Sequence, residues 1–96
     1  MGEHATKTVT VKIEGRVQGV FYRAWTEQNA RELGLNGSVR NSLDGSVEAV
    51  FSGLESNVEE MLERCLTGPP DAMVSAVIVL HEGGSVLPGF RVLPTG

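Results

Sequence analysis

The stretch Gly15–Arg23, with the sequence GRVQGVFYR, combines residue types that can bind an anion. It follows an alternating, strand-like segment and leads into residues with helical spacing. A loop that enters a helix N-terminus presents backbone N–H groups without intrahelical partners, and Gly15 and Gly19 allow several of them to converge. Arg23 adds a planar guanidinium that can bind two oxygens of a phosphate or carboxylate. The stretch therefore predicts a site for a doubly charged oxyanion.

Other phosphate-binding or nucleophilic sites fit the sequence poorly. No Gly-Lys-Ser/Thr triplet follows the glycines, which argues against binding of nucleoside triphosphates. Cys65 is the only cysteine, and Asp71 stands where a Cys-x5-Arg phosphatase loop needs arginine, so we expect Cys65 in the core. Ser85 replaces the second histidine of an HExxH zinc pattern that would begin at His81. We therefore expect no metal and no other cofactor.

The hydrophobic pattern predicts the element order βαββαβ, followed by a short terminal strand. Strands are expected over residues 7–14, 38–41, 46–51, 73–80 and 90–93, and helices over residues 22–33 and 56–66. Gly34 stands where a left-handed helix cap is needed, and Asp44-Gly45 is a strong hairpin signal between the second and third strands. Ser56 and Glu59 form a capping box, which predicts that the Ser56 side chain caps the start of the second helix.

This element order is typical of an α+β, ferredoxin-like sandwich, in which an antiparallel sheet carries both helices on one face. In the usual strand order of that fold, the strand over residues 73–80 lies at an edge, where it could pair with another chain. Nothing else in the sequence requires such pairing, and we expect a monomer.

Length and composition limit the function classes. Because 96 residues suffice for one domain, we expect a flexible tail over residues 1–6 and a single domain over residues 7–96. The net charge of −4 argues against a broad basic surface for nucleic acid. No apolar run is long enough to span a membrane, and residues 1–6 lack the features of a secretory leader. With a single cysteine as well, we expect a cytoplasmic protein.

Two linked motifs resemble those of the acylphosphatase family, enzymes that hydrolyse the carboxyl-phosphate bond of acyl phosphates. Gly15–Arg23 matches the family pattern G-R-V-Q-G-V-x-[FY]-R in full. Gly37–Asn41 and Asp44–Glu48 match its second motif, G-x-V-x-N followed by D-G-x-V-E. The resemblance extends from Thr8 to Val92 and implies the ferredoxin-like fold derived above.

The resemblance also implies roles for individual residues. Arg23 and the backbone amides of the loop would bind the substrate phosphate, and the Asn41 carboxamide would orient the attacking water. The loop comprises Gly15, Arg16, Val17, Gln18, Gly19, Val20, Phe21 and Tyr22. The substrate would be a small acyl phosphate, with inorganic phosphate as product and inhibitor. Because the leaving group is a weakly basic carboxylate, positioning and fixed dipoles can supply the catalysis without a strong general base.

Each of these roles has a structural alternative. Arg23 could pair with Glu27, four positions further along the helix. Arg16 could steer the anion or be a solvated loop charge. Asn41 could simply begin the turn before Asp44, because asparagine favours turns.

Two positions depart from the family pattern. Ser38 stands where family members often have a bulky side chain, and Leu43 where proline is common. We expect these changes to alter the lining near the site, where they would affect the preferred acyl group.

A ferredoxin-like fold also occurs in binding modules, so a non-catalytic anion-binding or regulatory module is the alternative function. An RNA-recognition domain would show several aromatic residues on its third strand. Residues 46–51 contain one aromatic residue and one acidic residue, which argues against RNA binding. Release of inorganic phosphate from a simple acyl phosphate would distinguish the enzyme from these alternatives.

Overall fold

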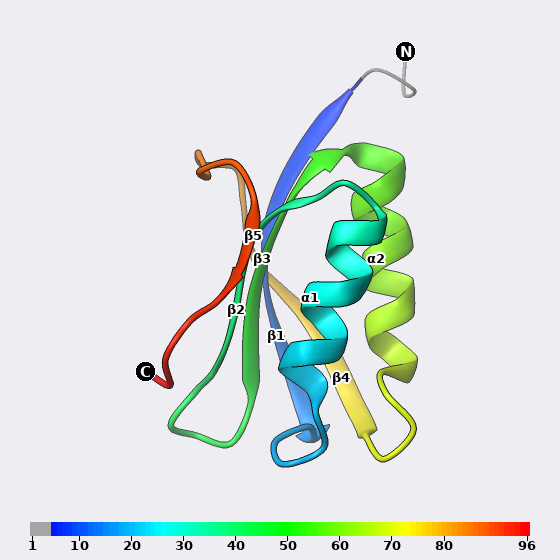
Figure 1. Ribbon diagram of the computed structural model, residues 1–96, viewed down its shortest axis with the longest axis vertical. Coiled ribbons are helices and arrows are strands. Elements are labelled where there is room, and N and C mark those ends of the chain that lie inside the picture. Colours follow the sequence, from blue (N-terminus) through cyan, green and yellow to red (C-terminus); the bar gives the residue numbers. More distant parts are fainter. Residues whose placement is uncertain (1–4) are drawn as a thin grey trace.

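Two helices cover one face of a five-stranded sheet in this computed structural model, which describes residues 5–96 (Figure 1). The elements are β1 (Thr6–Arg16), α1 (Tyr22–Glu32), β2 (Asn36–Asn41), β3 (Val47–Leu54), α2 (Glu55–Thr67), β4 (Met73–Glu82) and β5 (Phe90–Val92). Of the tail expected over residues 1–6, residues 1–4 lie outside the described part, and Thr6 belongs to β1. The predicted α+β, ferredoxin-like fold is confirmed.

The strands lie in the order β4-β1-β3-β2-β5. Alternation along β1 places Val9, Val11 and Ile13 on the face that the helices cover, and all three are fully buried. The pairs β1–β3, β1–β4 and β2–β3 are antiparallel as predicted, and β4 lies at an edge of the sheet. The short β5 pairs with β2 in parallel, so the sheet is mixed and the expectation of a purely antiparallel sheet is wrong.

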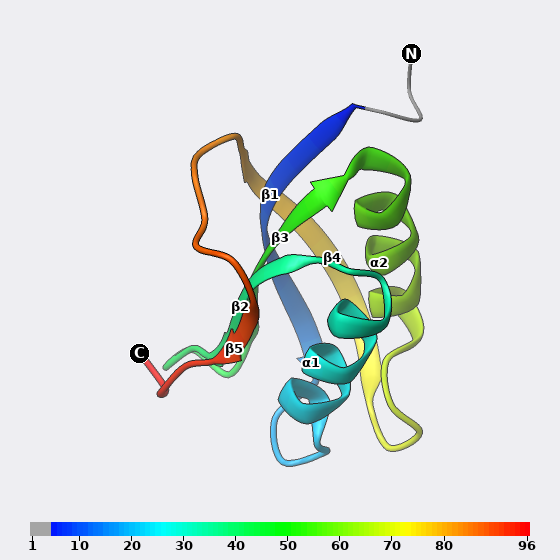
Figure 2. The same ribbon diagram turned by 45° about the horizontal axis from the view of Figure 1, so that its top comes forward.

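Each helix buries one apolar stripe against the sheet, and Figure 2 shows both helices on the same side. The fully buried residues of the two stripes are Tyr22, Thr26 and Ala30 in α1, and Val58, Met61 and Cys65 in α2. Gly34 has a φ of 67°, and the N–H groups of Gly34 and Leu35 donate to carbonyls of the last turn of α1. The predicted left-handed cap is therefore confirmed. No helix within residues 5–96 is long and apolar enough to cross a membrane.

The predicted capping box of α2 is wrong. The helix begins at Glu55, Leu54 occupies the N-cap position, and no side chain caps the helix. β3 ends at Leu54 and α2 begins at Glu55, so no residue separates the strand from the helix. The Glu55 N–H donates to the Ala5 carbonyl at 2.9 Å. Ser56 already lies in the first turn, so it cannot cap the helix.

Candidate active site

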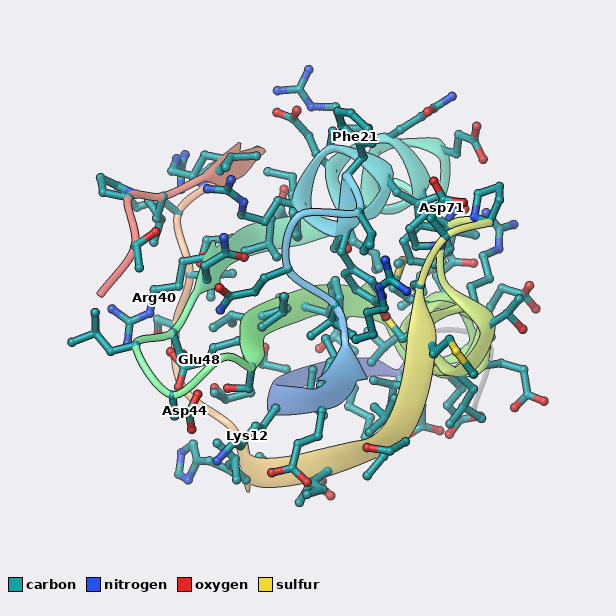
Figure 3. All side chains as sticks on the ribbon, turned by 90° about the horizontal axis from the view of Figure 1, so that it is seen from below. Lys12, Phe21, Arg40, Asp44, Glu48 and Asp71 are labelled. Carbon is teal, nitrogen blue, oxygen red and sulfur yellow. The ribbon has the colours of Figure 1, made fainter. Side chains whose placement is uncertain are left out.

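A cavity of about 390 Å³ opens at the end of the molecule where the loop after β1 enters α1. Figure 3 looks onto this end, from which the labelled Phe21 side chain projects. The loop, α1, β2 and β5 all contribute to the lining, which comprises Val17, Gly19, Phe21, Tyr22, Arg23, Ala24, Glu27, Asn41 and Val92. The cavity therefore joins the two motifs that the sequence singles out.

Arg23 is the second residue of α1 and is half-buried. Its guanidinium makes no hydrogen bond or ion pair with any residue in the range 5–96. Glu27, the alternative partner suggested by helical spacing, instead pairs with Arg31 at 3.0 Å. Arg23 thus presents a planar donor with unused hydrogen-bonding capacity to the cavity.

The backbone beside Arg23 also has unused donors. The first backbone N–H to bond within α1 is that of Trp25, which donates to the Phe21 carbonyl at 3.0 Å. Across the described residues, no carbonyl or side chain accepts a bond from the N–H groups of residues 17–24. Such a run of N–H groups at a helix N-terminus favours an anion.

The loop turns through two left-handed residues. Gly19 has a φ of 76°, and open space surrounds the position where a Cβ would stand, so the backbone angle alone favours glycine there. Phe21 has a φ of 65° and is the one non-glycine residue of residues 5–96 with positive φ. Its side chain is 81% exposed. A bulky residue in this conformation is strained, and such strain is concentrated at functional sites.

Half of the predicted loop does not line the cavity. Gly15 lies against β4, where a Cβ would clash with the Met73 carbonyl, and Val20 is buried in the core. Arg16 is exposed at the end of β1 and pairs in register with Met73.

Gln18 does not line the cavity either, and it connects the loop to the β2–β3 hairpin. Its Nε2 donates to the Ser42 and Ser46 carbonyls, both at 2.8 Å. The same hairpin closes through a bond from Ser42 N–H to Ser46 O (2.9 Å), with Gly45 at a φ of 94°, so the hairpin prediction is confirmed. Gln18 therefore fixes the loop relative to the strand end that carries Asn41.

Asn41 is the last residue of β2, and its backbone carbonyl accepts a bond from Gly96 N–H at 3.1 Å. Its carboxamide makes no hydrogen bond within the described chain. The hairpin turn instead uses Asp44, whose Oδ1 accepts from both Ser46 N–H (2.9 Å) and Ser46 Oγ (2.6 Å). The Asn41 side chain is thus not engaged in the turn and is available to a ligand in the cavity.

Two ion pairs flank the hairpin, and Figure 3 shows their labelled residues. Lys12 Nζ lies 2.9 Å from Asp44 Oδ2, and Arg40 Nη2 lies 2.9 Å from Glu48 Oε1. Hydrogen bonds from Ser46 and from Lys12 hold the pKa of Asp44 well below its usual value. The Asp44 carboxylate therefore stays ionised in the hairpin over the physiological range.

Tyr22 anchors the end of the loop to α2. Its hydroxyl donates to the Cys65 carbonyl at 2.7 Å, and burial raises its pKa. Burial also raises the pKa of the Cys65 thiol to about 12, which disfavours the thiolate. Cys65 is fully buried, as predicted.

The expectation that Ser38 lies near the site is wrong. Ser38 lines a separate cavity of about 260 Å³ together with Val50 and Arg91, and the two cavities share no lining residue. Ser38 and Asn41 are three positions apart on one strand, so their side chains point to opposite faces of the sheet. Leu43, at the hairpin, is 88% exposed and lines neither cavity.

Sequence reasoning missed three residues of the lining, namely Ala24, Glu27 and Val92. Glu27 follows Arg23 by four positions on a helix, a spacing that could have placed it beside Arg23, whereas Ala24 is the next residue along the chain and spacing gives no such signal. Val92 comes from the short parallel strand, and no signal in the sequence brings it to the site.

Comparisons with known proteins agree with the motifs. The acylphosphatase family model matches residues 9–91. The chain is 49% identical over 89 residues to an acylphosphatase of Rhodospirillum rubrum, covering 93% of this chain and 98% of the relative.

Solved structures agree as well. The structure of an acylphosphatase from Coxiella burnetii superposes with a TM-score of 0.87 at 36% identity, over 92% of this chain and 93% of that one. The crystal structure of acylphosphatase from Bacillus subtilis superposes with a TM-score of 0.85 at 28% identity, over 93% of this chain and 99% of that one. Family model, sequence identity and backbone agree over nearly all of the described residues, and the chain belongs to the acylphosphatase family.

Proposed function

We propose that this acylphosphatase binds the phosphoryl group of its substrate between Arg23 and the backbone N–H groups of residues 17–24, and that Asn41 orients the attacking water. One observation carries the proposal: Arg23 and Asn41 line the same cavity, and neither side chain has a hydrogen-bond partner within residues 5–96. Unused donors around one cavity support binding of a ligand rich in acceptor oxygens.

The chemistry needs little beyond this arrangement. The water oxygen forms a bond to phosphorus while the bond from phosphorus to the acyl oxygen breaks, and the acyl group leaves as a carboxylate. A phosphate oxygen of the substrate accepts the proton of the water. Charge spreads over the equatorial oxygens in the transition state, where the Arg23 guanidinium and the loop amides stabilise it. Asn41 contributes by holding the water in line with the bond that breaks.

Hydrolysis in ¹⁸O-labelled water tests the site of attack. With benzoyl phosphate as substrate, we expect one labelled oxygen in the released phosphate and none in the benzoate. Label in the benzoate would mean that the water attacks the carbonyl carbon, and would contradict the role given to Asn41. Failure of the purified protein to release phosphate faster than buffer would instead favour the non-catalytic anion-binding module.

The proposal also covers inhibition by phosphate, the oligomeric state and the cellular compartment of the enzyme. Inorganic phosphate should inhibit competitively, because the product keeps the oxygens that the site binds. A monomer is supported by two register irregularities where β4 pairs with β1, since bulges of this kind twist an edge strand away from pairing with another chain. A single, buried cysteine suits the reducing cytoplasm.

A further inference from the structure

The cavity extends beyond the part that a phosphoryl group would fill. The proposed phosphate-binding groups lie at the N-terminal end of α1, and Glu27 lies one turn further on, roughly 6 Å along the helix axis. Phe21 and Val92 add apolar surface to the lining. An acyl group attached to the bound phosphate would therefore lie against a wall that is apolar except for one carboxylate.

The Glu27 carboxylate is held in place by a specific contact. Arg31 Nη2 lies 3.0 Å from Glu27 Oε2 and also donates to the Phe90 carbonyl of β5 at 3.1 Å. The Arg31 side chain is 64% exposed and does not line the cavity, whereas Glu27 is 32% exposed and does. Glu27, the negative partner of the pair, thus belongs to the cavity lining, and Arg31, the positive partner, lies outside the lining and is fixed to the neighbouring strand.

The Glu27 carboxylate weakens the binding of an anionic substrate in this cavity, because the two negative charges repel each other. The apolar neighbours reduce the screening of its charge by water. A second negative charge on the acyl group would meet this repulsion, whereas an ammonium group would be attracted. Arg31 offsets part of the Glu27 charge, and the remaining field would favour neutral or cationic acyl groups over anionic ones.

We propose that Glu27 determines acyl-group specificity, so that the enzyme prefers acyl phosphates with a neutral or cationic acyl group over those with a second carboxylate. This inference rests on the proposed function, because it takes the phosphate to lie between Arg23 and the loop. Arg31 acts as a positioning residue that holds the carboxylate toward the cavity.

Three rigid substrates of similar size test the proposal: benzoyl phosphate, 4-carboxybenzoyl phosphate and 4-(aminomethyl)benzoyl phosphate. The quantity to measure is kcat/KM for each charged substrate divided by kcat/KM for benzoyl phosphate, which removes any general change in activity. We expect Glu27→Gln to raise this ratio for the carboxylate substrate and to lower it for the ammonium substrate, each by about three- to tenfold. Glu27→Lys should invert the order of the two charged substrates.

Control measurements separate local from general electrostatics. Glu59→Gln changes the net charge equally at an exposed position on α2 that does not line the cavity, and it should leave both ratios within about twofold of the wild type. Raising the ionic strength from about 0.02 to about 0.5 M should weaken the discrimination in the wild-type enzyme.

Unchanged ratios in both Glu27 variants would overturn the inference, and so would equal shifts in the Glu59→Gln control. Failure of the proposed function would look different. In that case Arg23→Lys would hydrolyse benzoyl phosphate at close to the wild-type rate, whatever the ratios in the Glu27 variants.

Discussion

At the scale of single residues, the proposed site depends on side chains that have no hydrogen-bond partner within residues 5–96. Other polar side chains in or beside the cavity are engaged, as with Glu27 to Arg31 and Gln18 to the hairpin. Arg23 and Asn41 differ, because neither bonds to any other residue in the described range. Their removal should therefore affect chemistry more than folding.

Arg23→Lys separates charge from geometry. Lysine keeps the positive charge and the helical propensity but replaces a planar, two-pronged donor with a flexible point charge. We expect kcat/KM for benzoyl phosphate to fall by at least about 100-fold, or ~2.7 kcal/mol, with little change in Tm. Arg16→Lys, in the same loop but outside the cavity lining, is the matched control and should stay within about threefold of wild type. If the Arg23→Lys enzyme were about as active as the wild type, the bidentate contact of Arg23 would not be the source of catalysis, and the loop amides and the oriented water would have to supply it.

Asn41→Ala tests the orientation of the water. Because the carboxamide takes no part in the hairpin turn, its loss should not disturb β2 or the phosphate-binding loop. We expect kcat to fall by at least about 100-fold while the inhibition constant of inorganic phosphate changes little. A matching loss of phosphate affinity would place Asn41 among the groups that bind the phosphate.

At the scale of elements, the loop between β1 and α1, which is proposed to bind the phosphate, is connected to the β2–β3 hairpin through Gln18. Gln18→Met keeps the length of the side chain but removes both bonds to the hairpin carbonyls. We expect a loss of about 1–2 kcal/mol in the free energy of unfolding and a fall of about tenfold in kcat/KM. Gln28→Met, at an exposed position of α1, is the control and should change neither quantity appreciably. If Gln18→Met and Gln28→Met had the same free energy of unfolding and the same kcat/KM, the bonds from Gln18 to the hairpin would not position the site.

The Asp44 carboxylate gives the hairpin a pH dependence. Its pKa in the folded protein is lowered below the ordinary 3.8, first by the Ser46 hydroxyl and then by Lys12. Its stabilising effect is therefore fully present above pH 3.8 and is progressively lost as the pH falls below that value. Urea unfolding of wild type and Asp44→Asn should show a difference in stability that is constant from neutral pH down to about 5 and shrinks in acid. A difference that grows on acidification would contradict this sign.

At the scale of the whole molecule, local patterns predicted the elements, and tertiary contacts decided the details. Alternation in β1 and the glycine after α1 are local signals, and both led to correct predictions. The capping box at Ser56 failed because the direct run of β3 into α2 overrides a side-chain cap. The face of Ser38 was predictable from its odd spacing to Asn41, since side chains alternate along a strand.

The part of the site that escaped sequence reasoning depends on pairings between distant segments. Gln18 contacts carbonyls that lie 24 and 28 positions away, and backbone carbonyls carry no sequence signal. Val92 reaches the cavity because β5 pairs with β2 in parallel. The sequence of a three-residue strand does not indicate which strand it pairs with or in which direction. Asn41, in contrast, was singled out by the resemblance of the second motif to the acylphosphatase family.

The core of the molecule and its chemistry should be separable. Cys65 is fully buried in α2 and its thiol has a raised pKa, so the mechanism proposed above uses no thiolate. That mechanism also assigns no step to a metal. Cys65→Ala removes one buried sulfur and should lower the free energy of unfolding by ~1 kcal/mol through lost packing. Below the unfolding transition, its kcat/KM for benzoyl phosphate should equal that of the wild type, and EDTA should leave both enzymes unaffected. Loss of activity with EDTA would require a metal in the transition state. Loss of activity in a folded Cys65→Ala enzyme would mean that packing beneath Tyr22, whose hydroxyl bonds to the Cys65 carbonyl, positions the phosphate loop after all.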